Sequence, residues 1–453
     1  MKSNKTTKRP QKRAIENLKE IIIPWLSLSK IKRTNQWQKL ALIIVTILGI
    51  FSLSILPGFA AKSVTVKVLI QAAEASLWQP LVEEFNQDSE DIKLEIVKGP
   101  SNTNLIEDLY TSSFLLGDSP YDLAYMDIVW VPKFAAAGWL EDLSERVSLQ
   151  ELKRIYLEGN VDGGIYKDKL YRMPLRSDGG MLYYRTDLLD KGKFAPPATF
   201  QELIDISKAL QKQGLIEWGY VWQGKQYEGL SAMFVEVLKG FGGFWIDPET
   251  NEVGLDKPEA INAVRFLRTT IEEGISPPGV STYAEEETRR LFQSGNSVFL
   301  RNWPYVVALA SDSEIAGKFD IKSMVSVPGK DSASCLGGWG LGIVKSSKHK
   351  EEAWQVIEYF NRKQVQRKLV SILGGVPARR SLFNNQKLVE KYSYLPAMLE
   401  VIDNAVLRPP IAQYAQASDI LQRYLSAAIT NAKTPESAMK AAAKETRVLL
   451  GNE

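Results

Sequence analysis

Hydrophobic and polar positions along the chain predict a strand, a helix and a second strand from residue 64 onward. The runs VTVKVLIQA, residues 64–72, and IKLEIV, residues 92–97, are rich in β-branched side chains and typical of strands. Between them, apolar residues recur at helical spacing from Leu77 to Phe85. YDLAYMD, residues 121–127, predicts a further strand. This order indicates an α/β fold with a parallel, doubly wound sheet, in which ligands bind beyond the carboxyl ends of the strands.

The later part of the chain is mostly helical in pattern and contains one boundary. Near residue 175 a turn leads into a new hydrophobic run. Thr199 and Glu202 have the spacing of a capping box, and Gly214 is placed to end the helix that follows. A single amphipathic helix is predicted from residue 348 to near residue 374, and a largely helical tail closes the chain.

The net charge of +3 is concentrated at the N-terminus. Residues 1–39 hold eleven Lys or Arg against two Glu, so this tail carries +9 and the rest of the chain carries −6. A nucleic-acid-binding protein would carry its basic excess on the folded body. The distribution therefore argues against nucleic acid as a partner.

A run of 17 uncharged residues, LALIIVTILGIFSLSIL at 40–56, follows the basic tail. With the small residues after it, this run has the features of an export signal cleaved after about Ala60, and it is also long enough for a short membrane anchor. We therefore expect residues 40–60 to be an N-terminal hydrophobic helix that serves as either a signal peptide or an anchor. Both alternatives leave the basic tail, residues 1–39, in the cytoplasm and the body outside it. We expect the body in the periplasm or at the extracytoplasmic face of the inner membrane.

Cysteine and histidine are nearly absent from the 453 residues, with Cys335 and His349 the single examples. One cysteine excludes an intramolecular disulfide and a cysteine zinc cluster. His349 lies in the polar stretch SSKHKEE, which is typical of a solvated helix start. Metal sites usually draw on several such ligands, and a catalytic triad would need this one histidine. We expect neither a metal nor a cofactor.

The stretch SCLGGWGLGI, residues 334–343, places four glycines around Trp339. It matches neither the phosphate-binding P-loop nor the GxGxxG dinucleotide loop. Two interpretations remain from the residues alone. The stretch is a glycine-rich strand against a neighbouring backbone, or a shelf on which a ligand approaches the backbone closely.

Aromatic and charged residues occur together at predicted turns. A sugar ring stacks its apolar face on an aromatic side chain, while its hydroxyls donate to carboxylates and accept from arginine. Each residue also has a structural alternative, since a buried Trp is often core and an Asp at a strand end is often a helix cap. The candidates are Glu74, Asp127, Trp130, Asp178, Trp222, Trp303, Trp339 and Arg408.

Six blocks in order, from about residue 64 to the end, resemble the extracellular solute-binding proteins of carbohydrate ABC importers, and within them the trehalose/maltose-binding branch. The basic tail has no counterpart in that pattern. The blocks are YDLAYMDIVWVPKFAAAGWLEDLSE, SDGGMLYYRTDLLDKGKFAPPATFQELI, WQGKQYEGL, FQSGNSVFLRNWPYVVA, GGWGLGIVKSSKHKEEAW and LRPPIAQYAQASDILQRYL.

The resemblance implies a two-lobe periplasmic-binding-protein fold of type II, with discontinuous lobes joined by hinge strands and the sugar between them. Lobe one is expected at residues 64–174 plus 328–374. Lobe two is expected at residues 175–327 plus 375–450.

The resemblance also implies roles for particular residues. Carboxylates would accept sugar hydroxyls, aromatic rings would stack on the sugar, Gly338 would offer its amide or space, and Arg408 would donate to sugar oxygens. Arg176 stands where close relatives are expected to have an aromatic residue, which leaves the identity of the sugar open. The ligand-binding set is Glu74, Asp127, Asp178, Trp303, Gly338, Trp339 and Arg408, with Arg176, Trp130 and Trp222 as further candidates.

The function that the resemblance implies is capture of a sugar by lobe closure and its delivery to the membrane permease of an ABC importer, with no chemistry on the sugar. Trehalose, maltose, sucrose and glucosylglycerol all offer a pyranose ring with vicinal hydroxyls. Two alternatives remain. One is a membrane-tethered sugar sensor, and the other is a secreted glycosidase that would use two of the carboxylates as acid and base.

Overall fold

A computed structural model describes residues 63–100, 102–373 and 376–451. The predicted basic tail, residues 1–39, and the predicted signal peptide or anchor, residues 40–60, lie outside the described residues. Within the described residues, no helix combines the length and the apolar character that crossing a membrane requires. The body from Ser63 to Glu453 forms one unit by its internal contacts.

The first sheet has five strands in the order β2–β1–β3–β11–β6. β1 pairs in parallel with β2 and β3, whereas β11 is antiparallel to both β3 and β6. The three strands predicted between residues 64 and 127 are thus confirmed and form the parallel part of this sheet. The strands are β1 (Val64–Gln71), β2 (Ile92–Gly99), β3 (Leu123–Asp127), β6 (Met173–Gly179) and β11 (Leu336–Ile343).

The second sheet has four strands in the order β10–β7–β9–β8. β7 is antiparallel to β10 and β9, and β8 is parallel to β9. The chain passes from the first sheet to the second at Gly180, the single residue between β6 and β7. The strands are β7 (Met181–Arg185), β8 (Trp218–Val221), β9 (Ser297–Asn302) and β10 (Phe319–Lys322), and β4 (Ile165–Tyr166) with β5 (Lys169–Leu170) makes a separate hairpin.

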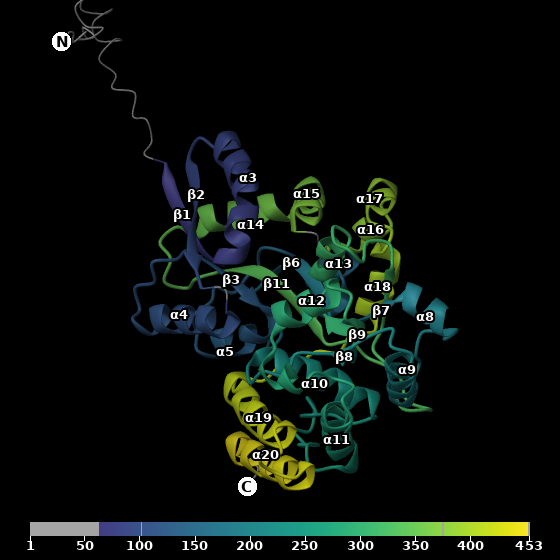
Figure 1. Ribbon diagram of the computed structural model, residues 1–453. Helices are drawn as coiled ribbons and strands as arrows, with labels where there is room; N and C mark the ends of the chain where they lie inside the picture. The colour runs from purple at the N-terminus through teal and green to yellow at the C-terminus, as the bar shows by residue number, and fades with distance from the viewer. Residues whose placement is uncertain (1–62, 101, 374–375, 452–453) are drawn as a thin grey trace, which may run out of the picture. The chain divides into compact units, whose positions relative to one another are not determined.

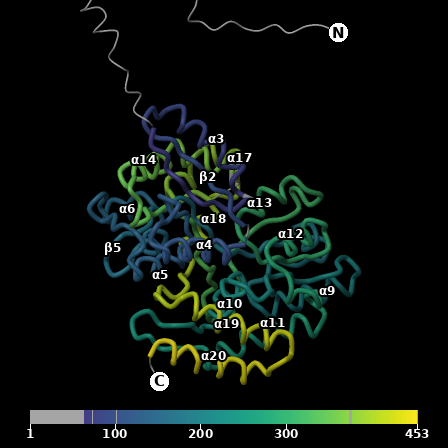
Figure 2. The backbone as a smooth tube through the Cα atoms, turned by 90° about the vertical axis from the view of Figure 1, so that its left-hand side faces the viewer, coloured from purple at the N-terminus to yellow at the C-terminus, as the bar shows by residue number. Residues whose placement is uncertain are grey.

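Helices pack on both sheets. α3, α4 and α14 contact the first sheet, α9 and α12 contact the second, and α18 contacts a strand of each. Figures 1 and 2 both show α19 and α20 side by side, next to α10 and α11. The helices before residue 250 are α3 (Ala72–Asp88), α4 (Thr103–Leu115), η2 (Ile128–Trp130), α5 (Val131–Ala136), α6 (Leu149–Ile155), α7 (Glu158–Asp162), α8 (Thr186–Gly192), α9 (Phe200–Lys212) and α10 (Glu228–Gly240). Those after it are α11 (Pro258–Glu272), η3 (Pro278–Thr282), α12 (Glu285–Gln293), α13 (Tyr305–Ala310), α14 (Lys350–Asn361), α15 (Lys363–Leu373), α16 (Arg380–Phe383), α17 (Gln386–Lys391), α18 (Leu395–Asp403), α19 (Tyr414–Ile429) and α20 (Pro435–Leu450).

Local signals placed some helix ends correctly. The capping box is present at α9, where the Thr199 side chain accepts from the backbone N–H of Glu202 and the Glu202 side chain accepts in return. Gly214 follows α9 with a φ of +69°, a conformation that favours glycine. The predicted start, cap and end of this helix are therefore confirmed.

The single helix predicted from residue 348 onward is wrong, because the structure has two helices, α14 and α15. The backbone at Arg362 between them is extended, with ψ of 136°. Arg379 donates to the Asn361 carbonyl at 2.6 Å, and Gln366 donates to the Phe360 carbonyl at 3.1 Å. These side chains satisfy the carbonyls at the end of α14, so the chain can bend there. The apolar periodicity continues through the bend and hid it from the sequence.

The glycines of β11 accommodate the neighbouring strand β6. Gly338 has a φ of +141°, and a Cβ at Gly340 would lie 2.3 Å from the Met173 carbonyl oxygen. All eight residues of β11 are buried. The glycine-rich stretch is thus a buried strand in close contact with another backbone, and a contact of Gly338 with a ligand stays a prediction.

Candidate ligand-binding site

Three adjacent strands of the first sheet place Asp127, Trp339 and Arg176 in one row. Trp339 on β11 lies opposite Asp127 on β3 and opposite Arg176 on β6 in the register of the sheet. Residues directly opposite each other share a face of the sheet. Asp127 ends β3, and its carboxylate accepts from the backbone N–H of Val129 at 3.4 Å, which caps η2. The sheet therefore aligns a predicted carboxylate, a predicted aromatic ring and a guanidinium.

Arg176 links two of the predicted carboxylates. Its Nη1 donates to Glu74 Oε1 at 2.7 Å, and its Nε donates to Asp178 Oδ2 at 3.2 Å. The Tyr125 hydroxyl donates to the other Glu74 oxygen at 3.2 Å. The Arg176 guanidinium carbon also lies 5.7 Å from the centroid of the Trp339 ring. We call Glu74, Arg176 and Asp178 the Arg176 cluster. The cluster contacts the indole of Trp339, which the sequence analysis predicted as a stacking surface for a sugar.

Asp178 has a perturbed pKa within this cluster. Burial raises the pKa of the Asp178 carboxyl from 3.8 to about 6, with Arg176 opposing the rise and the charges of Glu74 and Asp127 adding to it. An ionised carboxylate accepts hydrogen bonds from sugar hydroxyls more strongly than a neutral carboxyl does. The pKa therefore predicts that ligand affinity depends on pH.

We expect the dissociation constant for sugar to be about tenfold larger at pH 5 than at pH 7, because only about a tenth of a carboxyl with pKa 6 is ionised at pH 5. The pH dependence of folding stability has the opposite sign to that of sugar affinity. Between pH 3.8 and about 6 the folded Asp178 holds a proton that the unfolded chain releases, so its contribution to stability is lost as pH rises through this interval. Titration calorimetry from about pH 5 to 7 measures the first effect, and thermal unfolding from about pH 4 to 7 measures the second. Asp178→Asn should flatten both profiles, and an unchanged affinity across this range in the parent protein would contradict the prediction.

Arg408 links Asp127 to a carboxylate that the sequence did not single out. Its Nη2 donates to Asp127 Oδ1 at 3.1 Å and its Nη1 donates to Glu228 Oε1 at 2.6 Å. The hydroxyls of Tyr414 and Ser418, both on α19, also donate to the Glu228 carboxylate, that of Ser418 at 2.6 Å. Arg408 is 3% exposed. We call Asp127, Arg408 and Glu228 the Arg408 cluster, which joins the end of β3 to the start of α10.

Trp303 lies next to the Arg176 cluster at the end of β9. A Cβ at Gly337 would lie 3.3 Å from the Trp303 ring and 3.2 Å from the Asp178 Cβ, so ring and carboxylate approach the same point of β11. The Trp303 indole N–H donates to Glu285 Oε1 at 3.3 Å. The Arg301 guanidinium carbon lies 4.2 Å from the ring centroid. Trp303 is partly exposed, unlike the buried Trp339.

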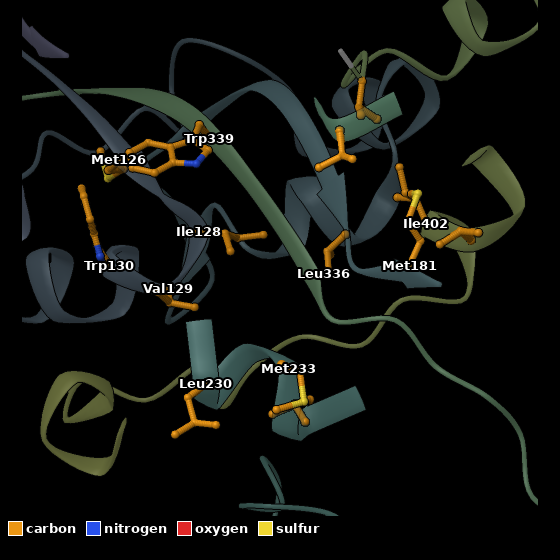
Figure 3. Close-up of a cluster of buried hydrophobic side chains, with 14 of the residues drawn as sticks. Met126, Ile128, Val129, Trp130, Met181, Leu230, Met233, Leu336, Trp339 and Ile402 are labelled. Carbon is orange, nitrogen blue, oxygen red and sulfur yellow. The ribbon is translucent and has the colours of Figure 1, made fainter. Parts of the chain in front are cut away.

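Trp339 and Trp130 are more deeply buried, at 6% and 2% exposed. The Trp339 ring stacks on Tyr125 with centroids 4.9 Å apart and meets the Trp130 ring edge-on at 5.3 Å. Figure 3 shows the two indoles next to each other. These contacts give both rings a packing role. Stacking of Trp339 or Trp130 on a sugar stays a prediction.

Trp222 is not brought together with the other predicted residues. It is fully buried, and its indole N–H donates to the hydroxyls of Thr270 at 3.3 Å and Ser276 at 3.1 Å. Both polar partners lie in the core around α11. Nothing in this arrangement points the ring toward the two clusters.

One pocket adjoins the Arg408 cluster. It lies among α4, η2, α10 and α19. Its lining includes Trp130, which the sequence predicted, and Glu228, which only the structure revealed. Carboxylates, amides, hydroxyls and one indole line it, so it offers hydrogen-bond partners to a polar ligand. No group of three or more His, Cys, Asp or Glu side chains suited to a metal ion is found among the described residues. The lining residues are Thr103, Asn104, Glu107, Val129, Trp130, Glu228, Tyr414, Ala415, Ser418, Asp419 and Gln422.

Glu228, Tyr414 and Ser418 were missed by the sequence reasoning. All three stand in blocks that carry the resemblance, QYEGL for Glu228 and QYAQASDILQRYL for the other two. Within those blocks they have the spacing of ordinary helix residues. Only the contact between α10 and α19 reveals that their side chains converge.

Two sheets linked by crossing strands, with charged clusters and tryptophans between them, define a two-lobe ligand-binding protein of the periplasmic type. The profile of the bacterial extracellular solute-binding proteins matches residues 71–367. The chain therefore belongs to that family.

Relatives agree with this assignment. A probable ABC transporter-binding protein of Deinococcus radiodurans is 32% identical over 360 residues, which are 77% of this chain and 84% of the relative. The maltose-bound MalE3 of T. maritima is 36% identical with a TM-score of 0.80, over 85% of this chain and all of that one. A Thermotoga lettingae solute-binding protein bound to α-D-tagatose is 27% identical with a TM-score of 0.75, over 86% of this chain and all of that one.

The predicted fold class and function class are thus confirmed. The protein is an extracytoplasmic sugar-binding protein of an ABC importer, and its relatives are binding proteins rather than enzymes. The family match leaves no ground for the glycosidase alternative.

Proposed function

We propose that this protein captures a disaccharide or small glycoside of the trehalose, maltose, sucrose or glucosylglycerol type between its lobes and presents it to the permease. Hydroxyl groups would donate to Glu74, Asp127 and Asp178, and Arg408 would donate to sugar oxygens. Trp303 would provide the main stacking surface, because it is partly exposed whereas Trp339 is buried.

The observation that carries this proposal is the convergence of two charged clusters with Trp303. The Arg176 cluster and the Arg408 cluster together present four carboxylates and two guanidinium groups in buried or partly buried positions. Partly buried carboxylates and guanidinium groups make stronger hydrogen bonds to a neutral ligand than neutral side chains do. A sugar with several hydroxyls can pair with them and at the same time stack on the indole.

The proposed lobes are residues 64–174 plus 328–374 and residues 175–327 plus 375–450. In support, all four strands of the second sheet fall within 175–327, and β1, β2, β3 and β11 fall within lobe one. β6 spans the boundary and continues to the crossing at Gly180. Closure about such crossing strands would let a ligand that contacts both lobes favour the closed form.

Attachment to the membrane through residues 40–60 is a further part of the proposal. The uncharged run at 40–56 after a basic tail supports it. If the anchor is retained, a sensor that binds sugar without delivering it is the second candidate function. Restored sugar uptake in a strain that lacks the protein would favour delivery over sensing.

Calorimetric titration of residues 63–453 with trehalose, maltose, sucrose and glucosylglycerol tests the proposal. We expect one sugar to bind with a dissociation constant at or below about 1 μM, which corresponds to about −8 kcal/mol. Trp303→Leu should weaken binding of that sugar about tenfold or more, because the ligand loses an aromatic stacking surface. Trp218→Leu, on β8 and partly exposed, serves as the matched control and should leave affinity unchanged.

Different outcomes have separate meanings. Binding that Trp303→Leu leaves unchanged would retain the sugar-binding function but remove Trp303 from the site. Absence of binding to all four sugars would contradict the proposed substrate class, and polyols and longer oligosaccharides would be titrated next.

A further inference from the structure

A buried ion pair lies where the chain crosses between the sheets. Glu236 of α10 and Arg301 of β9 are both 0% exposed. Arg301 Nε donates to Glu236 Oε2 at 2.7 Å and Nη2 donates to Oε1 at 2.5 Å. The remaining Nη1 donates to Gln223 Oε1 at 3.0 Å. The pair is therefore bidentate, and a third side chain supports it.

The pair contacts two segments that connect the sheets, which we call the crossing segments: Gly180 between β6 and β7, and the segment from β10 to β11 that ends at Cys335. The backbone N–H of Cys335, just before β11, donates to Glu236 Oε1 at 3.1 Å. The N–H of Gly180, between β6 and β7, donates to the Cys335 carbonyl at 3.1 Å. A Cβ at position 180 would lie only 1.7 Å from Glu236 Oε1. Gly180 is thus required for the carboxylate to rest against the crossing backbone.

The Arg301 guanidinium also contacts the ring of Trp303, the proposed stacking surface for the sugar. The Arg301 guanidinium carbon lies 4.2 Å from the Trp303 ring centroid, within the range of a cation–π contact. Arg301 and Trp303 are two residues apart at the end of β9, and the indole N–H is held separately by Glu285. A single pair of side chains therefore connects the crossing segments to the ring of Trp303.

A buried ion pair contributes little net stability compared with apolar residues of similar shape, since removing both charges from water offsets their attraction. Its geometry can still specify one arrangement of its neighbours. We propose that Glu236 and Arg301 are positioning residues, which fix the plane of Trp303 relative to the crossing segments so that the ring is correctly placed when the lobes close on a sugar. This inference rests on the proposed function and concerns the same site.

The test uses two variants, of which one keeps both buried charges and the other removes both. Arg301→Lys keeps the buried charge opposite Glu236 but lacks the planar group that covers the indole. Glu236→Gln combined with Arg301→Met removes both charges and keeps an acceptor for the Cys335 N–H. We expect each to weaken sugar binding about tenfold. The control is Arg185→Met with Asp187→Leu, which removes another bidentate pair, formed by a buried arginine and a partly exposed aspartate at the far end of β7, and should leave affinity unchanged.

A double-mutant cycle with Trp303→Leu separates positioning from general disturbance of the fold. If the pair acts through Trp303, Arg301→Lys has no further effect on affinity in the Trp303→Leu background. The inference would be overturned if Arg301→Lys weakened sugar binding equally in both backgrounds. It would also be overturned if Arg301→Lys left the affinity unchanged in the protein that retains Trp303.

A measurement without sugar keeps the inference testable if the proposed function fails. The near-ultraviolet circular dichroism difference between the parent protein and Trp303→Leu isolates the signal of the Trp303 ring. Arg301→Lys is expected to lose this signal, because the ring is no longer held in one orientation. Retention of the full signal overturns the positioning role, whereas failure of the parent protein to bind sugar refutes only the proposed function.

Discussion

Arg408→Met is expected to lower the free energy of unfolding by about 3–5 kcal/mol, because it leaves two partly buried carboxylates without their shared cation. Asp127 and Glu228 accept from different nitrogens of this guanidinium, at 3.1 and 2.6 Å. Its Nε is buried and finds no acceptor among the described residues, and under the proposed function Arg408 donates to sugar oxygens. We therefore also expect sugar affinity to fall by about a hundredfold, the size of a lost hydrogen bond to a charged group with its associated repulsion.

Urea unfolding and calorimetry measure these two effects separately. Arg380→Met is the matched control, since Arg380 makes a bidentate pair with Asp403 but is 46% exposed. An exposed pair contributes less than about 1 kcal/mol, and this variant should bind sugar normally. If Arg408→Met were as stable as the Arg380 variant, the Arg408 cluster would not hold β3 and α10 together.

Trp339→Ala is expected to lower the free energy of unfolding by about 3–5 kcal/mol through the cavity that it leaves. The ring packs on Tyr125, Trp130 and the Arg176 guanidinium, and it is 6% exposed. Loss of the ring also removes the contact between the indole and the Arg176 guanidinium. We therefore expect a weaker affinity for sugar, even if the ligand never touches the indole.

Two comparisons separate the packing role of Trp339 from a direct contact. Trp222→Ala removes an equally buried tryptophan that contacts neither charged cluster, and it should lower stability without changing affinity. Trp339→Phe retains most of the packing. If the phenylalanine variant binds sugar as well as the parent protein does, the ring of Trp339 acts by packing. A tenfold loss in that variant at normal stability would support stacking on the sugar.

The order of early elements was predictable because it depends on neighbours in the sequence. Apolar residues at helical spacing predicted α3, and β-branched runs predicted β1 and β2. The capping box of α9 needs only Thr199 and Glu202, which are three residues apart. The break between α14 and α15 could not be predicted in this way, because it depends on Arg379 reaching back to the Asn361 carbonyl.

The types of residue in the candidate site were also accessible from the sequence, since the blocks of resemblance mark Asp127, Asp178, Trp303 and Arg408. Which side chains pair with one another was not. Arg176 and Glu74 are 102 residues apart, and Arg408 and Glu228 are 180 apart. Pairing over such separations is set by sheet register and helix packing rather than by local pattern.

By itself, the sequence determined the local elements, the membership in a family and the kinds of side chain that a sugar would meet. The tertiary structure alone decided how those side chains are arranged. It placed Trp339 in a buried stack, left Trp303 partly exposed, and joined Arg176 and Arg408 to carboxylates from distant elements. The physical reason is that burial and ion pairing are properties of packed surfaces. The strands of the first sheet, α10 and α19 come together only when the chain has folded.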